Sequence, residues 1–314
     1  MAKISTTDLD IFPLALGGNV FGWTADEPQS FSVLDAYAAA GGNFIDTADM
    51  YSEWGPGNSG GESETIIGRW MKARGNRDGM IIATKVGKLS RLSGLSAKTI
   101  QVAVEHSLER LQTDRIDLYY AHADDPQTPL EETLGAFDAL VRDGKVRYIA
   151  ASNYSASRLA EALEVSKRHG FARYVALQPH YNLMERDEFE GALAEVVRRE
   201  ALSVIPYFAL AKGFLTGKYR PGGPEVKSAR AEGARAYLDE RGLRVLAALD
   251  EIAAAHHTTQ AAVALAWLLA QPTVVAPIAS ARNTAQLAEI LPFVELRLTQ
   301  EELDKLTTAS AHNP

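Results

Sequence analysis

The sequence contains no cysteine, and this absence excludes several kinds of chemistry. Disulfide bonds, thiolate nucleophiles and cysteine-ligated zinc or iron–sulfur centres are all ruled out. Long apolar runs are also missing, since the longest, residues 261–270, is about half of the roughly 20 residues that a membrane helix needs. The first residues, Met1 to Thr6, lack the apolar stretch of a signal peptide. We therefore expect a soluble, cytoplasmic protein that contacts no membrane.

Basic residues are outnumbered by acidic ones. The chain of 314 residues has 32 Lys plus Arg against 40 Asp plus Glu, a formal net charge of −8. Nucleic-acid binding requires a basic face, so this balance argues against a nucleic-acid partner. A small basic pocket for a phosphorylated cofactor is still compatible with it. Apolar residues make up 46% of the chain, enough for a large core, and the sequence leaves both a monomer and a homo-oligomer open.

Short runs rich in aliphatic and β-branched residues recur along the chain. They are mostly too continuously apolar for half-exposed strands and indicate parallel strands covered by helices. Eight such runs alternating with helices predict an α/β fold, a (β/α)8 barrel formed by residues 1–314 as one domain. An open doubly wound sheet is the alternative, but no G-x-G-x-x-G follows an early strand. The predicted strands cover residues 14–17, 44–46, 81–85, 116–122, 147–152, 174–178, 203–207 and 274–278.

The segments between these strands have helical spacing of apolar residues. Residues 3–12 precede the first strand and are expected to form a short hairpin over the barrel bottom. Two long loops, residues 53–62 and 220–235, are rich in Gly and Pro, and loops on this side of a barrel usually enclose the substrate. Helices are predicted at residues 30–40, 98–111, 130–143, 156–169, 187–200, 237–256, 259–270 and 299–308.

Ionisable residues stand where three successive strands end, which is where barrel enzymes carry their reactive groups. Asp46, Lys85 and His122 end the second, third and fourth strands, and Tyr51 follows Asp46 closely. A buried Lys and a buried Asp imply an ion pair, because either charge alone would be costly to bury. A Lys beside a Tyr hydroxyl is expected to lower the pKa of the Tyr, which can then donate a proton to a carbonyl oxygen.

Each of these residues also has an ordinary structural interpretation. Asp46 could be a turn residue, Lys85 a solvated side chain and His122 a turn histidine. A metal site is not expected, because Asp46 and His122 lack a third ligand and Lys85 would repel a cation. Four such residues on three successive strands nevertheless favour a shared catalytic role.

At this point the sequence resembles a known family. The segments N-F-I-D-T-A-D-M-Y, T-K-V-G, D-L-Y-Y-A-H and Y-I-A-A-S-N-Y, in this order and spacing, are similar to those of the aldo-keto reductase superfamily, including its bacterial NADP(H)-dependent members. The likeness spans nearly the whole chain. It implies reduction of an aldehyde or ketone, with Tyr51 as general acid, Lys85 and Asp46 tuning it and His122 positioning the substrate carbonyl.

The resemblance also implies that NADP(H) lies across the top of the barrel. Ser152, Asn153 and Gln178 would bond the nicotinamide amide, and Tyr207 would stack under its ring, although packing alone could explain that Tyr. Lys218 would contact the pyrophosphate. Phe208 stands where the family more often has Ser, which removes one hydroxyl contact. The further positions implied as cofactor contacts are Gly18, Asn19, Val20, Leu210, Lys212, Gly213, Ser280, Arg282, Gln286 and Glu289.

Arg282 and Ser280 at a helix start suit a 2′-phosphate, which favours NADP(H) over NAD(H). Ile290 replaces the Asn that often contacts adenine in this family. Three aromatic residues, Phe21, Trp23 and Trp54, are candidate walls of a pocket for an apolar or aromatic carbonyl substrate, or else lid or core residues.

Two other functions are consistent with parts of the sequence. Some members of the family are regulatory subunits that bind the cofactor with little turnover, and the intact set of four strand-end residues argues against that function. A barrel hydrolase could use Asp46 with Glu62 or Glu64, but it leaves Lys85, Arg282 and Gln178 unexplained.

Overall fold

The computed structural model describes residues 1–312, and eight parallel strands form its centre. All eight predicted strands are present, with ends that differ by a few residues. Two further short strands form a hairpin at the N-terminus. The strands are β1 (Ala2–Lys3), β2 (Asp10–Ile11), β3 (Ala15–Gly17), β4 (Phe44–Asp46), β5 (Ile81–Val86), β6 (Ile116–Ala121), β7 (Val146–Ser152), β8 (Tyr174–Gln178), β9 (Ser203–Val204) and β10 (Ile278–Ala279).

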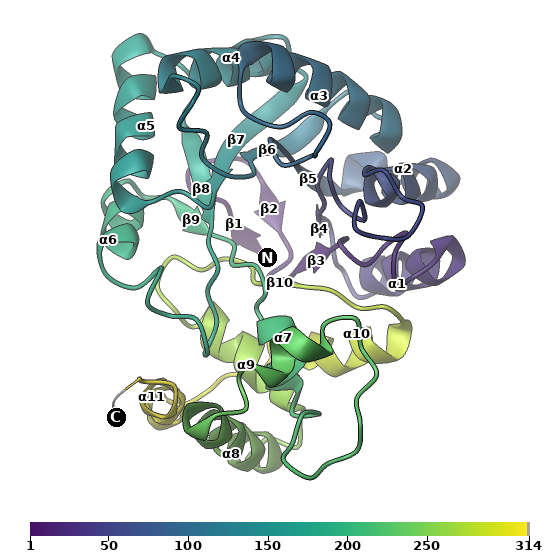
Figure 1. Ribbon diagram of the computed structural model, residues 1–314, viewed down its shortest axis with the longest axis vertical. Coiled ribbons are helices and arrows are strands. Elements are labelled where there is room, and N and C mark those ends of the chain that lie inside the picture. Colours follow the sequence, from purple (N-terminus) through teal and green to yellow (C-terminus); the bar gives the residue numbers. More distant parts are fainter. Residues whose placement is uncertain (313–314) are drawn as a thin grey trace.

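The eight parallel strands form a closed (β/α)8 barrel. Neighbours follow the order β10-β3-β4-β5-β6-β7-β8-β9. Backbone bonds join the two ends of this row: Val275 N donates to Val204 O (3.0 Å) and Ile278 N to Pro206 O (2.9 Å). The β9 and β10 strands are shorter than expected. Figure 1 shows the helices around the outside of the strands.

Eleven α-helices are assigned within residues 1–312, and most match the predicted ones. Local caps explain several ends: Ser155 accepts a hydrogen bond from Arg158 N at the start of α5, and Gly170 (φ 67°) ends it. The helices are α1 (Glu27–Ala39), α2 (Glu62–Arg74), α3 (Ala97–Leu111), α4 (Leu130–Arg142), α5 (Ala156–His169), α6 (Ala192–Arg199), α7 (Ala231–Arg235), α8 (Glu240–Ala255), α9 (Gln260–Leu269), α10 (Thr284–Ile290) and α11 (Gln300–Ala309).

Three differences from the sequence prediction stand out. Helix α2 was not predicted, because Gly61 at its N-cap (φ 92°) gives no side-chain capping bond to mark its start. The expected 220–235 loop ends in the short helix α7. Helix α6 starts five residues later than expected, after turns. In residues 1–312, every helix is too short or too polar to cross a membrane.

The N-terminal hairpin covers the bottom of the barrel, as predicted. Strands β1 and β2 pair antiparallel, and Ile4, Leu9 and Ile11 are buried against residues at the N-terminal ends of the strands, among them Phe44 and Ile81. Figure 1 shows the hairpin framed by the barrel strands. With its bottom covered, the barrel interior is accessible to ligands from the C-terminal ends of its strands.

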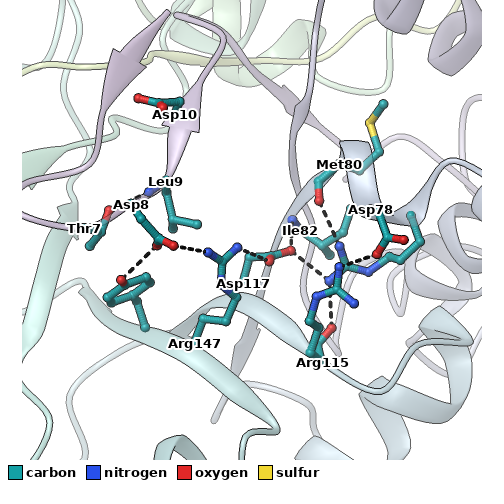
Figure 2. Close-up of polar contacts among 12 residues, drawn as sticks. Thr7, Asp8, Leu9, Asp10, Asp78, Met80, Ile82, Arg115, Asp117 and Arg147 are labelled. Atoms are coloured by element: carbon teal, nitrogen blue, oxygen red, sulfur yellow. Dashed lines mark hydrogen bonds and ion pairs between the residues drawn. The ribbon is translucent and has the colours of Figure 1, made fainter.

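A buried carboxylate joins this hairpin to the strands (Figure 2). Asp117 on β6, 1% exposed, accepts hydrogen bonds from Arg77 Nη2 (2.8 Å), Ile82 N (2.9 Å) and Arg147 Nη1 (2.9 Å). Arg147 in turn donates to Asp8 of the hairpin (2.8 Å). Each buried oxygen of Asp117 therefore has a charged partner, and the network holds β5, β6 and β7 in register with the hairpin.

The first prediction concerns this network. Replacing Asp117 with Ala leaves the largely buried Arg77 without its carboxylate partner, while Arg147 keeps only the exposed Asp8. We expect Asp117→Ala to lower the free energy of unfolding by about 3–5 kcal/mol, measured by urea denaturation. Asp78→Ala, which removes an exposed partner of Arg115, should have a much smaller effect. Equal effects of the two substitutions would contradict a structural role for the buried network.

Candidate active site

Four strand-end side chains converge at the C-terminal end of the barrel. Asp46 is the last residue of β4, Lys85 lies near the end of β5 and His122 directly follows β6. Tyr51 reaches the same place from the turns that follow β4. Adjacent parallel strands end at the same edge, so these residues meet although up to 76 positions separate them, from Asp46 to His122.

Lys85 is the centre of this cluster. Its Nζ, fully buried, donates to Asp46 Oδ2 (2.7 Å), to the Thr47 carbonyl (2.7 Å) and to Tyr51 Oη (3.0 Å). The Tyr51 hydroxyl donates to Asp46 Oδ2 (3.3 Å), and Gln178 Nε2 donates to Asp46 Oδ1 (2.9 Å). All three donors of the ammonium and both oxygens of the carboxylate are thus satisfied, which a buried ion pair requires.

The pKa of Tyr51 corrects one expectation from the sequence. Burial, followed by the nearby Asp46 carboxylate, raises the pKa of Tyr51 well above its ordinary value instead of lowering it. The expected lowering depends on Lys85 alone, whereas the Tyr51 hydroxyl also contacts Asp46, the ion-pair partner of that lysine. Burial lowers the pKa of Lys85, and Asp46 opposes this effect. Tyr51 therefore holds its proton at neutral pH.

His122 stands across from Tyr51, with ring centroids 6.0 Å apart. Burial, then Lys85 and Lys88, lowers the pKa of His122 well below its ordinary value, so the imidazole is neutral. Its Nδ1 is buried and has no partner among the described residues. A neutral ring with one N–H can donate a hydrogen bond to an oxygen placed between His122 and Tyr51.

A cleft of about 1160 Å³ runs from these residues across the top of the barrel. Lys85 lies beneath its floor, behind Tyr51 and Asp46. Gly18 and Phe21 do not line it: Gly18 N is bonded to Asp46 O (2.8 Å), and Phe21 is fully buried in the core, so it forms no pocket wall. The predicted site residues that line the cleft are Asn19, Val20, Trp23, Asp46, Tyr51, Trp54, His122, Ser152, Asn153, Gln178, Tyr207, Phe208, Leu210, Lys212, Gly213, Lys218, Ser280, Arg282, Gln286 and Glu289.

Polar side chains in the middle of the cleft are bonded to one another. Ser152 Oγ donates to Gln178 O (2.8 Å), and Asn153 Nδ2 donates to His122 O (2.8 Å). Tyr207 Oη donates to Asn153 Oδ1 (2.8 Å). These bonds fix the side chains that the sequence assigned to the nicotinamide end, with the Tyr207 ring at the cleft surface.

The other end of the cleft carries two cations, Lys218 and Arg282. Burial and the nearby Arg282 guanidinium lower the pKa of Lys218, so two cations stand close together, a placement that an anion would stabilise. Between the two ends, three non-glycine residues, Phe208 (φ 50°), Ala211 (47°) and Lys212 (58°), have left-handed backbone within five positions. Such strained backbone clusters at ligand sites.

Comparison with known proteins identifies the family. The sequence model described as "Aldo/keto reductase family" matches residues 13–311. The chain belongs to the aldo/keto reductase family. It is 35% identical over 312 residues to "Uncharacterized oxidoreductase YrpG" of Bacillus subtilis, covering 96% of this chain and 93% of that protein.

Two further relatives extend this likeness. "Protein tas" of Escherichia coli is 32% identical, over 97% of this chain and 95% of that one. "Norsolorinic acid reductase stcV" of Emericella nidulans is also 32% identical, over 93% of this chain and 76% of that one. The chain is thus an oxidoreductase of a family that generally uses NAD(P)H and acts on small carbonyl compounds.

The geometry and the family both exclude the barrel hydrolase. Glu64 points outside the barrel, where it accepts hydrogen bonds from Thr84 Oγ1 (2.5 Å) and Arg110 Nε (2.7 Å). Glu62 accepts one from Ser59 N (2.7 Å), and neither glutamate lines the cleft. Within residues 1–312, no cluster of three or more His, Cys, Asp or Glu could hold a metal ion.

Two cations of this oxidoreductase were not found from the sequence. Arg230 lines the cleft with its guanidinium 5.5 Å from the ring centre of Phe208 and 5.8 Å from that of Trp23. Lys88, exposed at the rim, lies close enough to affect the pKa of His122. Arg230 falls in the predicted long loop, but no motif marked it, because its neighbours come from distant segments.

A second buried carboxyl group lies just outside the barrel. The side chain of Asp49, which lies between Asp46 and Tyr51 along the chain, is fully buried. Neither of its carboxyl oxygens has a hydrogen-bond partner among residues 1–312. Burial, followed by the Glu64 carboxylate, raises the pKa of Asp49 to about 8, against the opposing effect of Arg110. The Arg110 guanidinium thus lies near two carboxyl groups, those of Glu64 and Asp49. Of these two groups, Asp49 is the one that holds a proton at neutral pH.

The second prediction follows from the sign of this shift. Between about pH 4 and 8 the folded enzyme keeps a proton on Asp49 that the unfolded chain releases, so this group makes folding less favourable as the pH rises. Asp49→Asn has no such proton. The unfolding free energy of the variant, relative to wild type, should therefore rise by about 1 kcal/mol per pH unit between about pH 5 and 7, in urea denaturation. Asp78→Asn is the exposed control, and a constant difference for Asp49→Asn would contradict the buried neutral carboxyl.

Proposed function

We propose that this oxidoreductase reduces an aldehyde or ketone to the alcohol, with NADP(H) as cofactor and Tyr51 as proton donor. The observation that carries the proposal is the Tyr51 hydroxyl at the cleft surface, 3.0 Å from the Lys85 ammonium. Relatives whose names contain the word "reductase" support the reductive direction. The cofactor would supply the hydride for the carbonyl carbon.

The residues of the chain have distinct roles in this proposal. A carbonyl oxygen bound between Tyr51 and His122 would accept a hydrogen bond from each. As negative charge grows on that oxygen, it becomes more basic than a phenolate and takes the proton of Tyr51. The Lys85 ammonium, held by Asp46, stabilises the phenolate that is left. Placement of these groups before reaction is the main contribution of the protein.

The cofactor would be held by groups along the cleft. Ser152, Asn153 and Gln178 offer polar atoms for an amide, and Tyr207 offers a flat ring for stacking. Lys218 offers positive charge for the pyrophosphate, which both cofactors carry. Arg282, with Ser280, offers a site for the 2′-phosphate, and this is the reason for preferring NADP(H) over NAD(H). A regulatory subunit that binds the cofactor without turnover would share this cleft but would not need the Tyr51–Lys85 pair.

The third prediction tests the proton donor. Tyr51→Phe removes only the hydroxyl and should lower kcat for a small aromatic aldehyde by about 100- to 10,000-fold, since general acids contribute on that scale. The rate is measured as loss of NADPH absorbance. NADPH binding, measured by fluorescence titration, should persist in the variant. Wild type that binds NADPH but reduces no carbonyl compound would favour the regulatory subunit, and wild type that does not bind NADPH would contradict the cofactor assignment.

The fourth prediction tests cofactor preference. Arg282→Leu removes a guanidinium expected to bond the 2′-phosphate, so NADPH should bind roughly 10- to 100-fold more weakly, as for loss of a charged hydrogen bond. NADH lacks that phosphate, and its dissociation constant should change little. Arg297→Leu is the matched control, because Arg297 is exposed and contacts only backbone carbonyls near its own position. Equal weakening of both cofactors by Arg282→Leu would contradict the assignment.

A further inference from the structure

A histidine lies behind Tyr207, the residue whose ring stands at the cleft surface. His180 follows β8, and Tyr207 follows β9. These strands pair in parallel, with Ala176 beside Ser203, and the same register continues past their ends, where His180 forms a bridge with Tyr207. Tyr207 N also donates to Pro179 O (3.0 Å). Because paired residues of parallel strands project to the same side, the backbone places the two rings side by side.

The rings of His180 and Tyr207 are stacked. Their centroids lie 5.1 Å apart with an angle of 12° between the planes, so the imidazole covers one face of the phenol. Tyr207 lines the cleft and His180 does not, so the covered face is turned away from the cleft. Phe208 packs on the phenol edge-to-face (5.3 Å, 67°), and the hydroxyl of Tyr207 donates to Asn153 Oδ1 (2.8 Å). One face of the Tyr207 ring is left for a ligand.

The imidazole of His180 is neutral at neutral pH. Burial lowers the pKa of His180, Glu185 and Glu188 oppose this effect, and Lys212 adds to the lowering. The Nε2 atom of His180 is buried and has no hydrogen-bond partner within residues 1–312. An imidazolium requires an N–H at that atom, and this N–H would have no acceptor there, which makes the charged ring costly to form.

The charge beneath Tyr207 matters because the two forms of the proposed cofactor differ in charge at the nicotinamide. The oxidised ring is a cation, and the reduced ring is neutral. A nicotinamide on the open face of Tyr207 would lie roughly 9–10 Å from the imidazole, since one further stacking step adds about 4.5 Å. A positive charge on the side chain of residue 180 would therefore repel the oxidised ring, whereas a neutral imidazole does not.

We propose that His180 is a positioning residue for the nicotinamide: its imidazole holds the plane of the Tyr207 ring, leaves one face of that ring for stacking and places no charge beneath it. This inference rests on the proposed function, because it assigns a role behind the same cofactor site. His180 contacts neither cofactor nor substrate in this arrangement and acts through Tyr207.

The test titrates wild type and three variants with NADP+ and with NADPH by calorimetry, without a carbonyl compound. His180→Arg places a flat cation beneath Tyr207. Its Kd for NADP+ should rise about 5- to 20-fold more than its Kd for NADPH, as expected for two unit charges at that separation in a partly buried site. His180→Ala removes the ring and should weaken both forms alike, by about 3- to 10-fold. His180→Phe supplies a flat neutral ring and should return both Kd values close to those of wild type.

His169→Arg is the matched control. His169 also stacks on an aromatic ring, that of Phe171 (5.2 Å, 17°), but it lies at the end of α5, and neither residue lines the cleft. This substitution adds the same charge and should leave the ratio of the two Kd values unchanged. Urea denaturation of each variant shows that it is folded before its Kd values are compared.

Three results would overturn the inference. If His180→Arg changes both Kd values equally or changes neither, the side chain of residue 180 does not act on the nicotinamide charge. If His180→Phe binds as weakly as His180→Ala, a flat ring is not what holds Tyr207. If His169→Arg gives the same ratio as His180→Arg, the effect is one of net charge. These results leave the reductase intact, whereas wild type that binds neither NADPH nor NADP+ would contradict the proposed function as well.

Discussion

The buried pair of Lys85 and Asp46 is the interaction on which the candidate site depends. An ammonium at 0% exposure is tolerable only when every donor has an acceptor, and the acceptors here come from the end of β4 and the turns after it. If β4 and β5 were displaced by one residue, one of these side chains would point outward, because successive side chains alternate between the faces of a strand. The ion pair thus requires the strand register that brings Tyr51 to the cleft.

The barrel fixes this strand register and also the side from which ligands can reach the site. Its bottom is covered by the hairpin and joined to it through Asp117 and Arg147, so ligands reach the interior from the C-terminal ends of the strands. Every polar side chain discussed at the cleft comes from a strand end or the segment after it. A rigid ring of short strands with long connections on one side therefore separates stability, at the bottom, from ligand binding, at the top.

The sequence predicted what depends on local pattern and missed what depends on distant contacts. Continuous apolar runs identified the eight strands, and spacing within motifs identified the cluster around Lys85. Helix α2 was missed although Ile66, Ile67, Trp70 and Met71 have helical spacing, because a glycine-rich start conceals its N-terminus. Arg230 was missed because its position is defined by Trp23 and Phe208, which are far from it in sequence. Of the three proposed pocket walls, Phe21 proved to be a core residue.

The direction of the Tyr51 pKa shift changes how the proposed proton transfer should be understood. A tyrosine with a lowered pKa would be ionised in part and unable to donate in that fraction of molecules. Burial and Asp46 instead keep Tyr51 protonated, so the proton is available but is released only to a stronger base than phenolate. A carbonyl oxygen becomes such a base only as negative charge develops on it. In the proposed mechanism, the arrangement that makes Tyr51 a poor acid in the resting enzyme would therefore couple its ionisation to reduction of the carbonyl, with Lys85 placed to stabilise the charge once it forms.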